Sequence, residues 1–187
     1  MNKIILASQS PRRKQLLEWA EVPFEVVVSD TDESYPATLP PAEVAIHIAH
    51  NKALAVQQRL GTGKTILAAD TIVVLGDAII GKPAGREEAI NTLCALSGNT
   101  HVVITGVAIV KGQQVKTFAD LTEVTFHNLT REDITFYVEK YKPYDKAGAY
   151  AIQEWIGVVG IQSIHGDFYN VMGLPVSRVV QTLAGMQ

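Results

Sequence analysis

An aspartate interrupts an apolar run of the sequence. Asp70 lies within residues 66–75, a segment of aliphatic side chains broken only by Asp70 and Thr71. An unpaired carboxylate in such a run carries a large desolvation cost. Either the strand ends there and Asp70 lies at a cleft, or a metal or a cation holds its charge. A carboxylate that an apolar strand carries to a cleft is typical of a catalytic base or a metal ligand. The alternative is an ordinary N-cap or turn aspartate.

Two adjacent arginines begin a predicted helix. Ser10 is a good N-cap and Pro11 suits the first helical position, so Arg12 and Arg13 fall in the first turn. The helix macrodipole is positive there, and each cation costs about 0.3–1 kcal/mol. The pair makes sense if backbone N–H groups and guanidinium groups bind a phosphate together. The alternative is two solvated arginines.

Further charged side chains could join the same pocket. Lys52 lies inside a predicted long helix, and Lys82 follows a strand end. Taken singly, each is interpreted as an ordinary surface lysine. Glu33 forms a loop cluster with Asp30 and Asp32. Such a loop supplies oxygens to Mg²⁺ together with substrate phosphates, or it is simply solvated.

Other motifs do not support a site. Residues 61–65 imitate the end of a phosphate-binding P-loop, but the first glycine is replaced by Gln58 and a strand follows where a helix is required. His47 and His50 are three apart on a helix, and the absence of a further ligand set argues against zinc. Cys94 has no second cysteine to pair with and is expected to be a small buried hydrophobe.

The elements that would position these residues alternate along the chain. Strands are expected at residues 4–7, 24–28, 66–75, 78–80, 100–110, 114–126, 149–153 and 158–164. Helices are expected at 11–20, 41–60, 86–96, from Thr130 onward with Asp133 in a capping box, and at 174–183. An acidic loop is expected from Ser29 to Pro40. Crossovers and hairpins occur together, which predicts an α/β protein with a mixed sheet and one continuous domain over 1–187.

Composition narrows the function classes. The chain has 187 residues, 47% hydrophobic, with 16 basic and 19 acidic side chains and a net charge of −3. This composition excludes a disordered chain and argues against nucleic acid as the main partner. Apolar runs are too short for a signal peptide or a membrane span, so a cytoplasmic protein without a membrane partner is expected.

A set of short motifs, in order and across nearly the whole chain, resembles the Maf family of nucleotide pyrophosphatases. The motifs are Ser8-Gln9-Ser10-Pro11-Arg12-Arg13, Ala69-Asp70-Thr71, Gly81-Lys82-Pro83, Leu96-Ser97-Gly98 with His101, Thr122-Glu123-Val124, Asp145-Lys146-Ala147-Gly148-Ala149-Tyr150, Ile152-Gln153 and Met172-Gly173-Leu174-Pro175. No single motif is decisive, but the set is highly specific.

The resemblance implies a hydrolase that converts nucleoside triphosphates to the monophosphate and pyrophosphate with a divalent cation, Mg²⁺ or Mn²⁺. It implies an elongated two-lobed fold like that of inosine triphosphate pyrophosphatase, with a central cleft, and it suggests a homodimer. The segment ending at Gln153 resembles the branch acting on dTTP and UTP, and modified pyrimidine nucleotides are further candidates. Ala151 departs from the glycine more usual in that branch. Members have also been named septum-formation inhibitors.

The resemblance implies the roles of the general base and of the specificity positions, and the chemistry of the residues suggests the other roles. Asp70 matches the general base, and Glu33 with Asp70 are the candidate metal ligands. The candidate phosphate-binding residues are Ser8, Arg12, Arg13, Lys52 and Lys82. The specificity positions are Arg12, Thr71 and Gln153. An amide such as Gln153 offers a donor and an acceptor, which complements the edge of uracil or thymine.

Three other functions are weighed against hydrolysis. The main alternative is a non-catalytic nucleotide-binding regulator of septum formation or cell division. A carboxylate beside a polyanion argues against it, because simple binding does not need one. A phosphotransferase is disfavoured by the missing P-loop, and a nucleic-acid-binding module by the net negative charge.

Overall fold

The computed structural model describes residues 2–28 and 30–186, so Ser29 of the expected acidic loop lies outside the described residues. The chain folds into two compact units. The first comprises Met1–Thr71, Thr105–Asp120 and Gly173–Gln187, and the second comprises Ile72–Ile104 and Leu121–Met172. Three long strands contribute to both units: β3 (Thr65–Leu75), β5 (Thr100–Lys111) and β6 (Gln114–Phe126).

The sheet is mixed, as expected. Its path is β2-β1-β3-β5-β6-β7, and β4 pairs with β3. The short strands are β1 (Ile4–Leu6), β2 (Phe24–Val26), β4 (Ala78–Ile80) and β7 (Ile161–His165). β1 is parallel to β2 and β3, whereas β4 and β7 pair antiparallel with β3 and β6. This pattern confirms the predicted α/β class with crossovers and hairpins.

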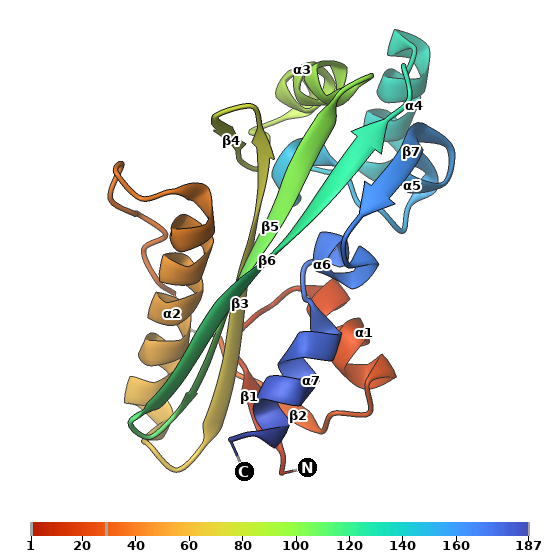
Figure 1. Cartoon of the computed structure of the whole chain (residues 1–187). Coiled ribbons are helices and arrows are strands. Elements are labelled where there is room, and N and C mark those ends of the chain that lie inside the picture. Colours follow the sequence, from red (N-terminus) through yellow and green to blue (C-terminus); the bar gives the residue numbers. More distant parts are fainter. Residues whose placement is uncertain (1, 29, 187) are drawn as a thin grey trace. The chain divides into compact units, whose positions relative to one another are not determined.

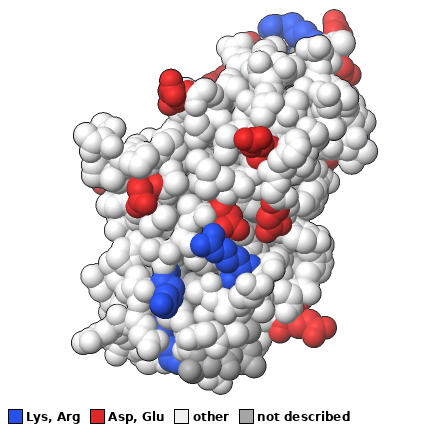
Figure 2. All heavy atoms as spheres, in the orientation of Figure 1, with Lys and Arg blue, Asp and Glu red and all other residues white. Residues whose placement is uncertain are grey.

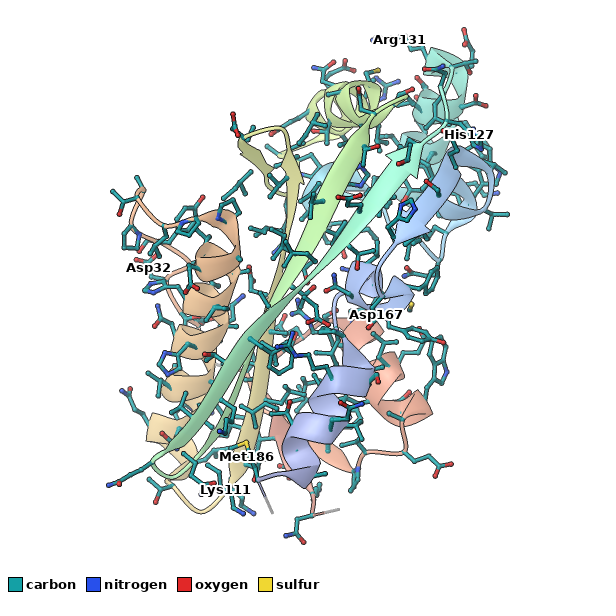
Figure 3. All side chains as sticks on the ribbon, in the orientation of Figure 1. Asp32, Lys111, His127, Arg131, Asp167 and Met186 are labelled. Atoms are coloured by element: carbon teal, nitrogen blue, oxygen red, sulfur yellow. The ribbon has the colours of Figure 1, made fainter. Side chains whose placement is uncertain are left out.

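In the first unit, helices cover both faces of the sheet (Figure 1). They are α1 (Pro11–Trp19), α2 (Pro41–Leu60) and α7 (Val176–Ala184). Small residues of α2, including Ala49 and Ala53, pack with Ile66 and Ala68 of β3 in one buried cluster. The Lys111 ammonium at the end of β5 donates to the Met186 carbonyl over 3.1 Å, which ties the chain after α7 to the sheet (Figure 3).

Local signals explain where these helices begin. The Ser10 hydroxyl accepts a hydrogen bond from the Arg13 backbone N–H over 3.5 Å, and Pro11 occupies the first turn, so Ser10 caps α1 as predicted. α2 spans the residues predicted from its pattern. It ends at Gly61, whose φ of 79° requires the left-handed freedom of glycine.

The second unit carries four α-helices among its described residues. They are α3 (Arg86–Leu96), α4 (Arg131–Tyr141), α5 (Trp155–Gly160) and α6 (Phe168–Met172), with a 3₁₀ turn at Ala147–Ala149. The predicted capping box of α4 is present: Thr130 Oγ1 accepts from the Asp133 N–H over 3.1 Å, and the Asp133 carboxylate accepts from the Thr130 N–H over 3.2 Å.

Several sequence expectations were wrong in this region. Residues 149–153 form no strand, because Gly148 and Ala149 adopt φ values of 71° and 58°, which an extended chain cannot follow. Residues 158–160 belong to α5, so β7 begins only at Ile161. Cys94 is exposed on α3 rather than buried, because it lies on the solvent side of that helix.

None of the described helices is both long and apolar enough to cross a membrane. On the face drawn in Figure 2, basic and acidic side chains are scattered among uncharged atoms.

Candidate functional site

The alternation of β3 separates two neighbouring polar side chains. Successive residues of a strand point to opposite faces, so Asp70 shares the face of Ala68, which packs against α2. Thr71 projects to the other face, where it meets Arg13 of α1. β3 also continues through Asp70 to Leu75, as the strand predicted over residues 66–75 does, so the first of the two readings of Asp70, in which a strand ends there, was wrong.

A cation holds the Asp70 charge, which was the second of the two readings. The Lys52 ammonium of α2 donates to Asp70 Oδ1 over 2.7 Å. Only 15% of the Asp70 side chain and 18% of the Lys52 side chain are exposed, so the pair is shielded from water. Charges in such surroundings attract one another more strongly than on the surface. The Asp70 carboxylate on β3 is therefore paired with a lysine 18 positions earlier in the chain.

Glu33 completes this cluster from the loop before α2. Its Oε1 also lies 2.7 Å from Lys52 Nζ, so two carboxylates meet at one ammonium. The loop is shaped by Asp32, whose carboxylate accepts from the Ser34 N–H and hydroxyl over 2.9 and 2.7 Å (Figure 3). The hydrogen bond from the Ser34 hydroxyl and then that from its N–H lower the pKa of Asp32. Among the described residues, no group of three or more His, Cys, Asp or Glu side chains is arranged to hold a metal.

Arg13 connects three segments on the opposite face of β3. Its Nε donates to the Gly173 carbonyl over 2.8 Å, Nη1 to Ser8 Oγ over 3.0 Å and Nη2 to Thr71 Oγ1 over 3.0 Å. Burial lowers the pKa of Arg13 to about 10, and the Asp70 charge opposes this effect. A fully solvated role for Arg13 is thereby excluded, because it bridges the residues before α1, β3 and the segment before α7.

The Thr71 hydroxyl is shared among several partners. Besides the Arg13 guanidinium, it lies 2.9 Å from Thr105 Oγ1 and 3.5 Å from the Gly173 carbonyl. Sequence reasoning missed Thr105, a fully buried side chain in the middle of β5. The available signal was the one that found Asp70, namely a polar residue inside an apolar run (residues 103–110).

The first unit also positions Ser8 and Arg12. Ser8 is buried directly after β1, and its hydroxyl accepts from the Ser10 N–H over 3.2 Å as well as from Arg13. Arg12 is partly buried in the first turn of α1, and its charge contributes to the lowered pKa of Arg13. The first unit thus contains seven of the residues singled out from the sequence, in two contact groups and with Arg12 beside Arg13. Glu33, Lys52 and Asp70 meet on one face of β3, and Ser8, Arg13 and Thr71 meet on the other.

The other two candidates, Lys82 and Gln153, belong to the second unit, and both are exposed. Lys82 follows β4, and Gln153 precedes α5. The Gly148 N–H donates to the Gly81 carbonyl over 3.2 Å, so the segments that carry Lys82 and Gln153 are joined within this unit.

The fold and the residues of the first unit together indicate the class of protein, a mixed α/β protein with a site suited to phosphate. In this protein Asp70, Lys52 and Glu33 meet at β3, and another helix begins with two arginines. Cations beside a helix N-terminus suit a phosphate ligand. The chain belongs to the Maf family, because the sequence model of the family described as "Maf-like protein" matches residues 3–186.

Curated relatives match over nearly the full chain. A protein of Parabacteroides distasonis is 50% identical over 97% of this chain and 94% of its own length, and one of Bacillus cereus is 49% identical over 98% and 95%. Both are named dTTP/UTP pyrophosphatase. The solved structure of the Staphylococcus aureus Ham1 protein covers 100% of both chains with a TM-score of 0.56 at 17% identity. That likeness shows the shared fold.

Proposed function

We propose that this protein hydrolyses dTTP and UTP to the nucleoside monophosphate and pyrophosphate. The observation that carries the proposal is the shielded Asp70–Lys52 pair with Glu33 on the same ammonium. Such an arrangement places a carboxylate that can accept a proton beside positive charge that can attract a polyanion. The names of the relatives at 49–50% identity supply the substrate class.

The reaction is an attack of water on the α-phosphorus. A bond forms between the water oxygen and the α-phosphorus, and the bond from the α-phosphorus to the bridging oxygen breaks. Asp70 accepts the proton of the attacking water, and pyrophosphate leaves with the electron pair of the broken bond. Charge builds on phosphate oxygens during this step, so positioned cations supply most of the stabilisation.

The cations of the proposed site have different surroundings. Lys52 is fixed by two carboxylates, and Arg13 by its three partners. Arg12 stands at the N-terminus of α1, where free N–H groups also favour an anion. We assign Arg12, Arg13, Lys52 and Lys82 to neutralising the triphosphate and the leaving pyrophosphate, with Ser8 as a hydroxyl contact.

The residues present fit a divalent cation. Glu33 and Asp70 direct one oxygen each at a single cationic atom, Lys52 Nζ. Mg²⁺ is typically held by one or two carboxylates together with substrate phosphates, and Mn²⁺ also accepts oxygen ligands. Glu33 and Asp70 would hold such an ion, which supplies positive charge to the phosphate oxygens when bound.

Base selection is assigned to Arg12, Thr71 and Gln153. Gln153 is exposed and has both a donor and an acceptor, so it can read the edge of uracil or thymine directly. The Thr71 hydroxyl is already bonded to Arg13 and Thr105, so its contribution is to shape the site rather than to read the base. Tolerance of both uracil and thymine is reasonable, because one methyl group is worth only about 1–3 kcal/mol of discrimination.

Incubation with Mg²⁺ or Mn²⁺ and a panel of dTTP, UTP, CTP, dATP, GTP and 7-methyl-GTP tests the proposal. We expect monophosphate and pyrophosphate from dTTP and UTP ahead of the others. Diphosphate and orthophosphate would overturn attack at the α-phosphorus. Binding without turnover would instead support the nucleotide-binding regulator of septum formation.

As part of the same proposal, residues 1–187 act as one domain in a homodimer. Sedimentation of the purified protein would check the homodimer.

A further inference from the structure

The segment that presents Gln153 is a closed turn, hereafter the Gln153 turn (residues 151–154). The Glu154 N–H donates to the Ala151 carbonyl over 3.1 Å, which closes the turn across Gln153. Its first residue, Ala151, is buried, whereas Gln153 is exposed. The position of the Gln153 side chain is therefore set by whatever holds the two ends of this turn.

One hydroxyl of α4 holds both ends. Tyr137 Oη accepts from the Ala151 N–H over 3.2 Å and donates to a carboxylate oxygen of Glu154. Tyr137 is fully buried, and its bond with the Ala151 N–H is buried as well, whereas the Glu154 side chain is 22% exposed. A buried N–H that loses its partner is costly, so the buried end of the turn at Ala151 depends on this hydroxyl.

Neighbouring contacts restrict the same turn from other sides. The Lys146 ammonium lies 3.7 Å from the Glu154 carboxylate, and only 11% of the Lys146 side chain is exposed. Just before the turn, Tyr150 Oη and His101 Nε2 are 2.7 Å apart in a buried hydrogen bond. A Cβ on Gly157 of α5 would come within 1.7 Å of the Ile152 carbonyl oxygen, so the helix backbone packs directly on the turn.

We propose that Tyr137 is a specificity-determining positioning residue, whose hydroxyl fixes the Gln153 turn so that the Gln153 amide meets the base in one placement. The proposal rests on the proposed role of Gln153 in base selection. Tyr137 is not a catalytic residue, because its hydroxyl is bonded within the protein. Holding a reading group in one place raises selectivity, since the wrong base then leaves hydrogen-bonding groups unpaired.

The test compares Tyr137→Phe with a matched control, Tyr141→Phe. Tyr141 is also on α4, and its ring stacks on Tyr137 at 5.0 Å between centroids. We expect Tyr137→Phe to lower the ratio of kcat/KM for UTP to that for CTP about tenfold, or about 1.4 kcal/mol. The change should appear mainly in KM, and Tyr141→Phe should keep the wild-type ratio. Glu154→Gln, which retains an acceptor for the Tyr137 hydroxyl, should lose selectivity less than Tyr137→Phe.

A double mutant separates positioning from general loosening of the fold. In a Gln153→Ala background, we expect Tyr137→Phe to change the UTP/CTP ratio less than about twofold, because the group that it positions is gone. Hydrogen exchange should show faster exchange of the Ala151 amide in Tyr137→Phe. An unchanged ratio in Tyr137→Phe, or the same loss with and without Gln153, would overturn the proposal. If Tyr137→Phe does not fold, Glu154→Ala supplies the same comparison from the other end of the bond.

The outcome for Gln153→Ala alone distinguishes the two proposals. A wild-type ratio in that variant would refute Gln153 as a base reader, and the specificity role of Tyr137 with it. A shifted ratio in Gln153→Ala combined with a wild-type ratio in Tyr137→Phe would refute only the role of Tyr137. Failure of the wild-type protein to hydrolyse any nucleotide would refute the proposed function itself.

Discussion

Replacement of His101 should change how the stability of this protein depends on pH. His101 at the start of β5 is 1% exposed, and its ring lies edge-on to those of Phe126 and Tyr150. Burial lowers the pKa of His101 from 6.5 to about 4, because the charged imidazolium would lose its hydration. The same burial raises the pKa of Tyr150, so both partners of the 2.7 Å hydrogen bond are neutral near pH 7.

The direction in which the free energy of unfolding changes with pH depends on whether the folded or the unfolded chain binds the proton of His101. Between about pH 6.5 and pH 4 the unfolded chain protonates His101, whereas the folded protein does not. The neutral His101 ring therefore makes its full contribution to the free energy of unfolding above pH 6.5. This contribution decreases as the pH falls towards 4. The pKa difference is 6.5 − 4, or about 2.5. At about 1.4 kcal/mol for each unit of pKa, the full effect is about 3.5 kcal/mol, of which about 3 kcal/mol has developed at pH 4.

Urea unfolding at several pH values from 7.5 to 4 measures this effect in the wild-type protein and in His101→Gln. We expect the variant to be less stable at pH 7.5, because it loses the aromatic contacts, but to lose about 3 kcal/mol less on acidification. His127→Gln is the matched control, since His127 is an exposed histidine just after β6 (Figure 3). Parallel pH curves for the wild-type protein and His101→Gln would refute the conclusion that His101 is buried in its neutral form.

Three further outcomes are expected. Asp70→Asn should reduce hydrolysis of UTP by about 10²-fold or more, while equilibrium binding of UTP persists; near-wild-type turnover would remove Asp70 from the mechanism. Arg13→Lys should lower thermal stability and raise KM, because one ammonium cannot replace a guanidinium that bridges three partners; unchanged values for both would contradict the bridging role. Gly106→Ala should destabilise the fold by about 3 kcal/mol or more, because its Cβ would approach the Ala45 backbone of α2 to 2.2 Å. Gly63→Ala, which meets nothing within 4 Å, is the control, and equal chemical-denaturation midpoints for the two variants would contradict the close packing.

Local signals were sufficient wherever a few neighbouring residues decide the structure. The Ser10 cap and the Thr130–Asp133 box fix the starts of α1 and α4, because each satisfies backbone groups within three residues. The failure at residues 149–153 has the opposite cause. Their apolar pattern reports burial correctly, but burial alone does not distinguish a strand from a buried turn.

For a similar reason, the sequence indicated some residues of the candidate site but not the contacts that they make. The sequence showed that Asp70 needed a partner, but Lys52 became that partner only when α2 packed on its face of β3. Thr105 was missed because its role arises from contact with Thr71, 34 residues earlier in the chain. A polar residue in an apolar run thus indicates that its side chain needs a hydrogen-bond or charge partner, whereas the tertiary fold determines which partner it meets.

The Asp70–Lys52 pair also bears on why such a group remains in an apolar strand. Both side chains are less than one-fifth exposed, so folding removes much of the hydration of two charges. The attraction within shielded pairs often only offsets this desolvation cost, and apolar replacements of similar size are frequently as stable. Fold stability alone therefore gives little reason for a carboxylate among the aliphatic residues of β3. A reacting site does give a reason, because a carboxylate held beside positive charge can act as a base on the water that attacks a bound triphosphate.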